Sequence, residues 1–327
     1  MSNYVQKVAI IGAGGNIGKH ITQELLKTGN HIVTAISRPS SNSTLPNGVK
    51  VACVDYTSED DTELVQALTG QQALIVSLSV AARGAAINII RAAAKAKVQY
   101  LFPNWFGHDA ENDALCRDSF VAGMRDDICS EIKKLGVSSY FLLGCGFWYE
   151  WSLSGGPDRY GFDFKERKLV LFDGGEVHIN TSTWPQCGRA IAALLSLKIA
   201  PEGENDDSVT LTQFCNRSVY ISSFRVTQRD IFESVKRVTG TSEKDWVIME
   251  DSAKKRWEEA AGELKKGNSA AFTKFMYSRM WFPTGDGDHE TTRGLHNDLL
   301  GLPQEDLDEF TSIAVRMGEN SEVPFSH

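Results

Sequence analysis

The stretch VAIIGAGGNIG, residues 8–18, decides the fold of this chain. Four apolar residues typical of a buried strand lead directly into a glycine loop, and a helical pattern follows as far as Lys27. Glycines let a backbone turn tightly and approach a pyrophosphate, whose charge the N-terminus of the next helix stabilises. The strand–loop–helix context therefore predicts a dinucleotide-binding domain. The spacing of Gly12, Gly15 and Gly18 is the variant typical of short-chain dehydrogenases.

Apolar runs and helical patterns alternate through the rest of the first half. Strands are expected at residues 8–11, 31–36, 49–54, 73–77, 100–102 and 139–143, and helices at 16–27, 84–96 and 119–135. Strands separated by helices of about 10–15 residues imply right-handed crossovers and a parallel sheet covered on both faces. Residues 1–150 are thus predicted to form a doubly wound α/β domain of the Rossmann type.

The regular alternation stops after about Gly146, so residues 151–327 are expected to form a smaller, mostly helical substrate-binding region. A helix start at Thr183 has capping-box spacing to Gln186, with Pro185 in the first turn. Residues 180–222 are predicted to pack back onto the first domain. The aromatic residues between Phe272 and Trp281 have the helical spacing of a core stripe, and a subset from 277 to 282 is a candidate pocket wall.

Composition excludes several classes of function. The chain has 327 residues and a net charge of −8, without the cluster of basic residues that binding to nucleic acid or an anionic membrane needs. Six cysteines are scattered without a CxxC pair and no HExxH motif occurs, so reduced thiols, a cytoplasmic location and no metal are expected. No apolar stretch approaches the length of a membrane span, and the N-terminus lacks a cleavage site for a leader.

The end of the second predicted strand indicates which dinucleotide is bound. An NAD enzyme would place an acidic residue here for the ribose 2′-hydroxyl, whereas this chain has Arg38 between Ser37 and Ser40. A guanidinium suits a 2′-phosphate, which favours NADP(H) over a merely solvated arginine. Asp55 and Tyr56 are placed to flank the adenine, although an ordinary turn explains them equally well.

Longer stretches carry a resemblance to a family. The chain resembles the atypical short-chain dehydrogenases of the NmrA/isoflavone reductase family, in its fungal CipA-like branch. The matching stretches are GAGGNIGKHITQELLKTGNHIVTAISR, FPNWFGHD, GFWYEWSLSGGPDRYGFDF, NTSTWPQCGRAIAALLSL and GLHNDLLGLPQEDLDEFT. The resemblance implies NADPH, a substrate domain over the nicotinamide, and reduction of C=C or C=N bonds in phenolic or alkaloid natural products of fungal secondary metabolism. The complete set of residues that we expect to bind the cofactor is Gly12, Gly15, Asn16, Ile17, Gly18, Ser37, Arg38, Ser40, Asp55, Tyr56, Ser79, Asn104, Cys145, Gly146 and Phe147.

Arg125, Trp105 and Tyr149 are the catalytic candidates in a chain that departs from the family pattern. Family reductases keep a lysine on the helix after the fifth strand. Residues 120–125 here contain no lysine, and their one basic residue is Arg125, which can orient an oxyanion but cannot shuttle a proton. Trp105 stands where relatives usually carry an acid, and it offers a surface for stacking or simply packs in the core. Tyr149 is the best remaining donor in its region. No tyrosine has a lysine four residues later, which excludes the usual Tyr-x-x-x-Lys chemistry.

The sequence therefore predicts an NADPH-dependent oxidoreductase that lacks the family lysine and acts on a small hydrophobic molecule, as a monomer or homodimer. Two alternatives stay open. One is a redox-neutral enzyme that cyclises an iminium and retains NADP(H). The other is a non-catalytic NADP-sensing regulator of the NmrA type.

Overall fold

One parallel sheet organises the N-terminal half of the molecule. In the computed structural model, which describes residues 2–78 and 84–323, eight parallel strands join this sheet in the order β12-β7-β5-β4-β1-β2-β3, with β6 also pairing with β7. The strands are β1 (Lys7–Ile11), β2 (Ile32–Ser37), β3 (Lys50–Cys53), β4 (Ala73–Val76), β5 (Tyr100–Pro103), β6 (Phe106–Gly107), β7 (Ser139–Gly144) and β12 (Arg217–Tyr220). This order reverses beside β1, which places the glycine loop at the crevice where open α/β sheets bind ligands.

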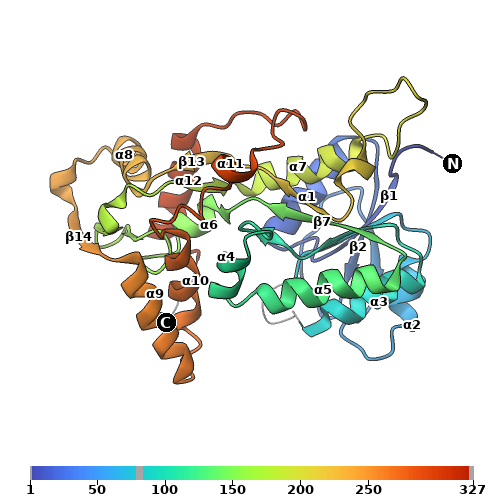
Figure 1. The fold of residues 1–327 in the computed structure, drawn as a ribbon, viewed down its shortest axis with the longest axis horizontal. Coiled ribbons are helices and arrows are strands. Elements are labelled where there is room, and N and C mark those ends of the chain that lie inside the picture. The colour runs from blue at the N-terminus through green and yellow to red at the C-terminus, as the bar shows by residue number, and fades with distance from the viewer. Residues whose placement is uncertain (1, 79–83, 324–327) are drawn as a thin grey trace.

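Helices cover both faces of the sheet (Figure 1). Helices α1 (Asn16–Lys27) and α7 (Trp184–Ser196) pack together on one face, while α2 (Thr62–Leu68), α3 (Ala86–Lys95) and α5 (Ala122–Leu135) cover the other. Successive side chains of a strand point to opposite faces. Val8 and Ile10 therefore belong to the core beneath α1 and α7, whereas Ala9 and Ile11 belong to the core beneath α3. The expected doubly wound fold is confirmed.

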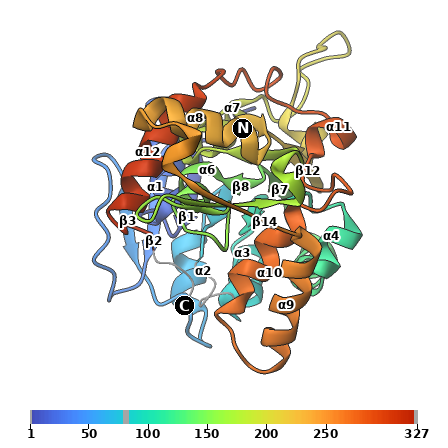
Figure 2. The ribbon, with the colours of Figure 1, turned by 90° about the vertical axis from the view of Figure 1, so that its left-hand side faces the viewer.

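The C-terminal part adds helices and two small sheets (Figure 2). The sheets are β14-β10-β9 and β13-β11-β8, built from β8 (Phe147–Trp148), β9 (Phe162–Asp163), β10 (Lys168–Phe172), β11 (Ile179–Ser182), β13 (Phe224–Val226) and β14 (Val247–Asp251). The helices are α6 (Tyr149–Leu153), α8 (Gln228–Thr239), α9 (Ala253–Lys265), α10 (Ala271–Met280), α11 (His289–Arg293) and α12 (Leu307–Glu319). An aromatic core that includes Tyr160, Phe162 and Trp281 joins these elements. The short helix α4 (Asp113–Asp118) precedes α5 in the first half of the chain and contacts α10.

Helix α7 begins where the sequence places its N-cap. The hydroxyl of Thr183 accepts a hydrogen bond from the backbone N–H of Gln186 at 3.1 Å. The backbone N–H of Thr183 donates to the Ser223 hydroxyl at 3.0 Å, and the Gln186 amide oxygen accepts from Arg189 at 2.9 Å, so only half of the expected capping box forms. Through α7 and β12, residues 180–222 contact the first domain.

The segment that follows α10 also contacts the main sheet. His289 is buried at the start of α11 and hydrogen-bonds the carbonyl of Ile221 at 3.0 Å, because the segment after α10 returns to the edge of the main sheet. Within residues 2–78 and 84–323, no helix combines the length and apolar character that crossing a bilayer requires.

Candidate functional site

The glycine loop is shaped so that two of its glycines cannot be replaced without moving the backbone. Gly12 has a φ of +84°, and a Cβ there would lie 1.9 Å from the carbonyl oxygen of Ser77. A Cβ on Gly18 would lie 1.9 Å from the carbonyl oxygen of Gly12. Helix α1 follows with Gly15 as an N-cap that has no side chain to satisfy the first backbone N–H groups. This close approach and the open helix N-terminus fit a dinucleotide pyrophosphate.

Arg38 lies at the end of β2, next to the segment that follows β3. Its guanidinium is exposed and lies 5.8 Å from the ring of Tyr56, which is buried. The Asp55 carboxylate accepts hydrogen bonds from the hydroxyl and the backbone N–H of Thr57, and these bonds lower its pKa. The structure thus brings Arg38, Asp55 and Tyr56 together at one edge of the crevice, with Asp55 already engaged in a turn.

A cavity of about 580 Å³ extends from the glycine loop towards the C-terminal part of the chain. One wall comes from Gly15, Asn16 and Ile17 and from the residues that follow β4 and β5. The opposite wall is mostly apolar and consists of Phe106, Val121, Met124, Phe147, Trp148, Trp151, Met276 and Tyr277. A cavity of this size and composition can hold a planar molecule beside a bound dinucleotide.

Asn104 lines the cavity and connects the ends of two neighbouring strands. Its backbone adopts a φ of +60°, and its side chain bonds both to the backbone N–H of Leu78 at 2.9 Å and to the Leu78 carbonyl at 3.3 Å. The side-chain amide thereby ties the end of β5 to the segment after β4. Ser79, also expected to bind the cofactor, lies outside the described residues.

Trp105 faces the cavity, as expected for a residue at the end of the fifth strand. Its side chain is 6% exposed, and its indole N–H donates to the carbonyl of His108 at 3.1 Å. The Trp105 and His108 rings lie 5.5 Å apart, centroid to centroid. Trp105 is therefore both a core residue and part of the cavity wall.

His108 is a functional candidate that the sequence analysis missed. It lines the cavity and is buried, yet neither ring nitrogen hydrogen-bonds to any other described residue. Burial lowers the pKa of His108 from 6.5 to about 4, so the imidazole is neutral near pH 7. Buried polar groups without partners are uncommon and are often functional. The only signal in the sequence was its position just beyond a strand end, in Phe106-Gly107-His108-Asp109.

Phe147, the residue expected to contact the nicotinamide ring, lines the cavity. Its ring stacks on Tyr277 at 4.1 Å, and both line the cavity. Gly146 before it has a φ of +65°, and a Cβ there would lie 2.0 Å from the carbonyl oxygen of Asn180. Cys145 is buried in the core beneath α1 and α7, and its carbonyl accepts from the Ser182 hydroxyl at 2.7 Å. Cys145 and Gly146 thus shape the strand end behind Phe147.

The structure places two of the catalytic candidates away from the cavity. Tyr149 is fully buried in the C-terminal core, where its hydroxyl hydrogen-bonds Thr311 at 2.7 Å and burial raises its pKa. Arg125 points to another side of α5, where it pairs with Asp113 at 2.9 Å and Asp126 at 2.7 Å. Neither group reaches a ligand in the cavity, because the backbone turns Tyr149 into the core and Arg125 towards α4. Neither placement favours a catalytic role.

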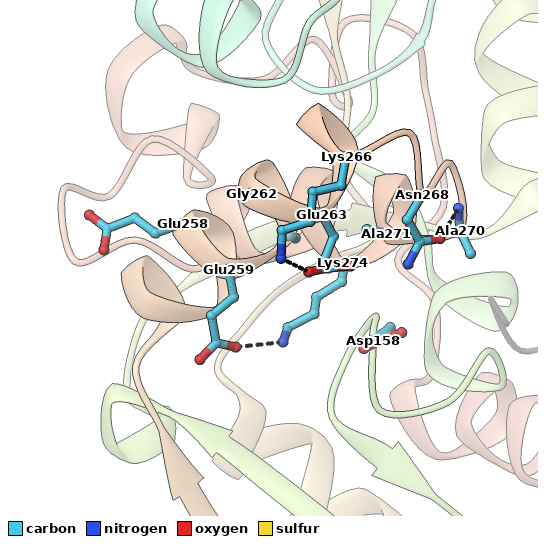
Figure 3. A pocket seen from close by; sticks show the side chains of 11 residues that line it. Asp158, Glu258, Glu259, Gly262, Glu263, Lys266, Asn268, Ala270, Ala271 and Lys274 are labelled. Carbon is cyan, nitrogen blue, oxygen red and sulfur yellow. Dashed lines mark hydrogen bonds and ion pairs between the residues drawn. The ribbon is translucent and has the colours of Figure 1, made fainter.

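A second hollow, of about 610 Å³, lies between α9 and α10 (Figure 3). It is open to solvent, and both of its lysines pair with glutamates of the same hollow. Lys274 contacts Glu259 at 2.9 Å, and Lys266 contacts Glu263 at 2.8 Å. The described residues also contain no group of three or more histidine, cysteine or acidic side chains that could hold a metal ion. The cavity beside the glycine loop is therefore the candidate active site.

Comparisons with known proteins agree with this location. An NAD(P)H-binding family model matches residues 12–112. The chain is 26% identical over 314 residues to oxidoreductase aprR of Aspergillus flavus, covering 93% of this chain and 96% of the relative. It is 27% identical over 240 residues to quinone oxidoreductase 2 of Escherichia coli, covering 69% and 78% of the two chains. A crystal structure of isoflavone reductase has a TM-score of 0.69 at 19% identity, covering 95% of this chain and 99% of that one.

These similarities support the resemblance to the NmrA/isoflavone reductase-like proteins. They also support an NAD(P)H-dependent oxidoreductase, since the curated relatives in Aspergillus flavus and Escherichia coli are both named oxidoreductases. The expected cofactor, NADP(H), agrees with the NAD(P)H-binding family model.

Proposed function

We propose that this protein uses NADPH to reduce a C=N or conjugated C=C bond in a hydrophobic natural product, an alkaloid or a phenolic compound. The observation that carries the proposal is the cavity of about 580 Å³ that joins the glycine loop to an aromatic wall. When bound, NADPH supplies a hydride to an electrophilic carbon of the substrate. The residues of the chain hold the two molecules in position and stabilise the charge that develops.

Arg38 selects NADPH over NADH in this proposal. Its exposed guanidinium ends β2, where a ribose 2′-phosphate is reached in Rossmann domains. A phosphate can accept two parallel hydrogen bonds from a guanidinium. The Tyr56 ring, 5.8 Å away, limits the directions that this side chain can take.

The aromatic wall orients the substrate. Trp105, Phe147 and Trp148 present large flat surfaces to the same cavity. Flat apolar surfaces bind planar substrates by stacking and exclude water. Holding the reacting carbon close to the hydride donor supplies several kcal/mol of the barrier reduction, on the order of what intramolecular reactions gain.

His108 supplies the polar contact in this proposal. A neutral imidazole donates one hydrogen bond from its N–H. We assign that bond to the heteroatom conjugated with the reduced bond, because this atom receives the displaced electron pair as the hydride arrives. The proton that completes the reduction comes from solvent as the product leaves. Hydrogen bonds to developing charge are worth about 10²–10³ in rate when the site is dry.

The cavity favours the conjugated C=C bond over the C=N bond of an iminium. The described lining residues include no carboxylate and no lysine. A permanent positive charge would thus find no anionic partner among them, whereas a conjugated carbonyl can use the N–H of His108. This preference separates the two halves of the proposal experimentally.

Cofactor binding is the first test. Fluorescence titrations with NADPH and NADH compare the wild type with Arg38→Ala, and Arg91→Ala is the matched control, an exposed arginine on α3 that pairs with Glu131. We expect Arg38→Ala to lose at least about tenfold in NADPH affinity, with NADH affinity unchanged and the control like wild type. Equal affinities for both cofactors in the wild type would refute the assignment of Arg38.

Turnover is the second test. NADPH absorbance is followed during addition of cyclic imines and conjugated phenolic ketones, with wild type, His108→Gln and His108→Phe. We expect oxidation with the ketones, partial activity in His108→Gln and a loss of about 10²-fold or more in His108→Phe. NADPH binding without oxidation by any compound would instead favour a sensor or a redox-neutral enzyme.

A further inference from the structure

The segment between β2 and β3 lies against the glycine loop. Residues 38–49, all of them described, connect these two neighbouring strands without a helix, and we call them the β2–β3 connection. The connection begins with Arg38, is rich in hydroxyl and amide side chains and contains no acidic residue. Such a segment can donate hydrogen bonds to a phosphate without repelling it.

Gly14 is the residue of the glycine loop that the connection contacts. A Cβ on Gly14 would lie 2.5 Å from the Cβ of Ser43 and 3.1 Å from its hydroxyl oxygen. The side chain of Leu45 lies next to the same point, at 3.7 Å. The φ of Gly14 is not positive, so its backbone conformation alone does not require glycine. The structural reason for a glycine at this position is therefore the close approach of Ser43.

The β2–β3 connection is held on both sides of this contact. Leu45 is partly buried and packs against the core beneath α1 and α7. Towards β2, the backbone N–H of Ser43 donates to the hydroxyl of Ser41 at 3.4 Å, and the backbone N–H of Ser41 donates to the carbonyl of Arg38 at 2.9 Å. The contact at Gly14 is therefore joined through two hydrogen bonds to the turn that begins at Arg38.

The backbone on both sides of Arg38 determines where its guanidinium can reach. Strand β2 fixes the residues before it as far as Ser37, and the β2–β3 connection fixes the residues after it. The guanidinium itself is exposed and lies beside the ring of Tyr56. An exposed arginine loses rotamer freedom when it binds a ligand, and a backbone that aims it at the ligand reduces this cost. Affinity for a 2′-phosphate therefore depends on where the connection lies.

We infer that Gly14 and Ser43 are positioning residues for Arg38 and thereby determine the selectivity for NADPH over NADH. Their contact holds the β2–β3 connection against the glycine loop, so that Arg38 is aimed at the ribose 2′-phosphate. Neither residue has to touch the nicotinamide or the substrate. The inference rests on the proposed role of Arg38, and it adds the feature of the fold that keeps this arginine in place.

The test uses a pair of substitutions that exchanges a Cβ across the contact. Gly14→Ala places its Cβ 2.5 Å from that of Ser43, closer than two carbon atoms can approach, so the connection must move. Adding Ser43→Gly to Gly14→Ala removes the overlap, because the Cβ is then present on one side only. Gly262→Ala is the matched control, since a Cβ there has no neighbour within 4 Å and α9 contributes no residue to the cavity.

Dissociation constants for NADPH and NADH are measured by fluorescence titration of the full-length protein, without substrate. We expect Gly14→Ala to weaken NADPH binding about tenfold and NADH binding no more than about twofold, because only NADPH uses Arg38. The double variant should return to within about threefold of the wild-type preference. Ser43→Gly alone should cost at most about fivefold in NADPH affinity, because a more flexible segment has to be ordered. Gly262→Ala should match wild type, and NADH binding shows that each variant is folded.

Three results would overturn the inference. The first is a Gly14→Ala variant that keeps the wild-type preference for NADPH. The second is an equal loss of both cofactors that Ser43→Gly does not restore, which would mean that the added Cβ obstructs the dinucleotide itself. The third is tighter NADPH binding by Ser43→Gly alone, which would mean that the connection occupies the place of a phosphate.

The role of Arg38 is tested separately from the role of the contact. A wild type that binds both cofactors equally would contradict the role of Arg38 and, with it, this inference. A preference that Arg38→Ala abolishes and Gly14→Ala leaves intact would contradict this inference alone. NADPH oxidation does not enter either measurement, so the proposed reaction is not tested here.

Discussion

Replacing Glu150 with glutamine should make the free energy of unfolding less dependent on pH. Glu150 lies near the start of α6 and is 2% exposed. Both carboxyl oxygens accept from the backbone N–H of Trp184 at 3.3 Å. Burial is the largest influence and, together with the nearby Glu305 carboxylate, raises the pKa of Glu150 from 4.5 to about 8.

The sign of the effect follows from linkage. In the folded protein Glu150 stays protonated up to about pH 8, whereas in the unfolded chain it ionises near pH 4.5. The unfolded state therefore binds fewer protons between these values, and stability falls as the pH rises through that window. The difference between the two pKa values of Glu150 corresponds to a loss of at most about 5 kcal/mol in the free energy of unfolding. Glutamine cannot ionise, so Glu150→Gln should lose this dependence and gain stability relative to wild type at alkaline pH.

Urea unfolding followed by tryptophan fluorescence checks this prediction. We compare wild type with Glu150→Gln at about pH 5, 7 and 9. Glu166→Gln is the control, because the Glu166 side chain is 64% exposed and its environment therefore changes little on unfolding. We expect the advantage of Glu150→Gln over wild type to grow by several kcal/mol across this range, and the control to follow wild type. Parallel profiles for wild type and Glu150→Gln would refute the reasoning, because they would mean that Glu150 is ionised in the folded state.

Three further variants test the site. Gly18→Ala should weaken NADPH binding about tenfold or more in calorimetry, because its Cβ would lie 1.9 Å from the carbonyl oxygen of Gly12; unchanged affinity would contradict the proposed cradle. Tyr149→Phe should lose about 1 kcal/mol in urea unfolding with its bond to Thr311, while the turnover rate stays constant; slower turnover at full stability would return Tyr149 to the catalytic candidates. Because burial lowers the pKa of His108 from 6.5 to about 4, the free energy of unfolding of the wild type should fall by about 3 kcal/mol as the pH falls between these values. His108→Gln should not show this fall in acid unfolding; an acid transition identical to that of wild type would argue against a neutral buried imidazole.

The fold could be predicted because its signals are local. The helix expected at residues 16–27 is α1 (Asn16–Lys27), because the glycine loop marks its start and the apolar spacing marks its buried face. The helix expected at 119–135 instead begins three residues later as α5 (Ala122–Leu135), and a separate short helix, α4 (Asp113–Asp118), precedes it. The break between α4 and α5 contains the left-handed Phe120, a conformation that the sequence does not signal because phenylalanine rarely adopts it.

The catalytic candidates depended on orientation, which is harder to predict. Val121 and Met124, three residues apart, face the cavity, so the helical repeat turns Arg125 about 100° away from it. Strand β8 has only two residues, and Tyr149 begins α6 with its ring in the C-terminal core. His108 was missed for a different reason. Its signal is the absence of a hydrogen-bond partner, which exists only once distant segments have packed around it.

The departures from the family pattern are related to one another once they are placed in the cavity. Trp105 stands where the resembled family usually carries an acid, and its ring contacts His108, while residues 120–125 contribute Val121 and Met124 but no lysine to the cavity wall. The described lining residues therefore include no carboxylate, lysine or arginine, and burial keeps the imidazole among them neutral. A single hydrogen bond is stronger in such a dry, uncharged environment than in water. The described part of the cavity wall therefore favours a reaction that needs close positioning and one neutral donor, and it disfavours one that needs a charged acid or base.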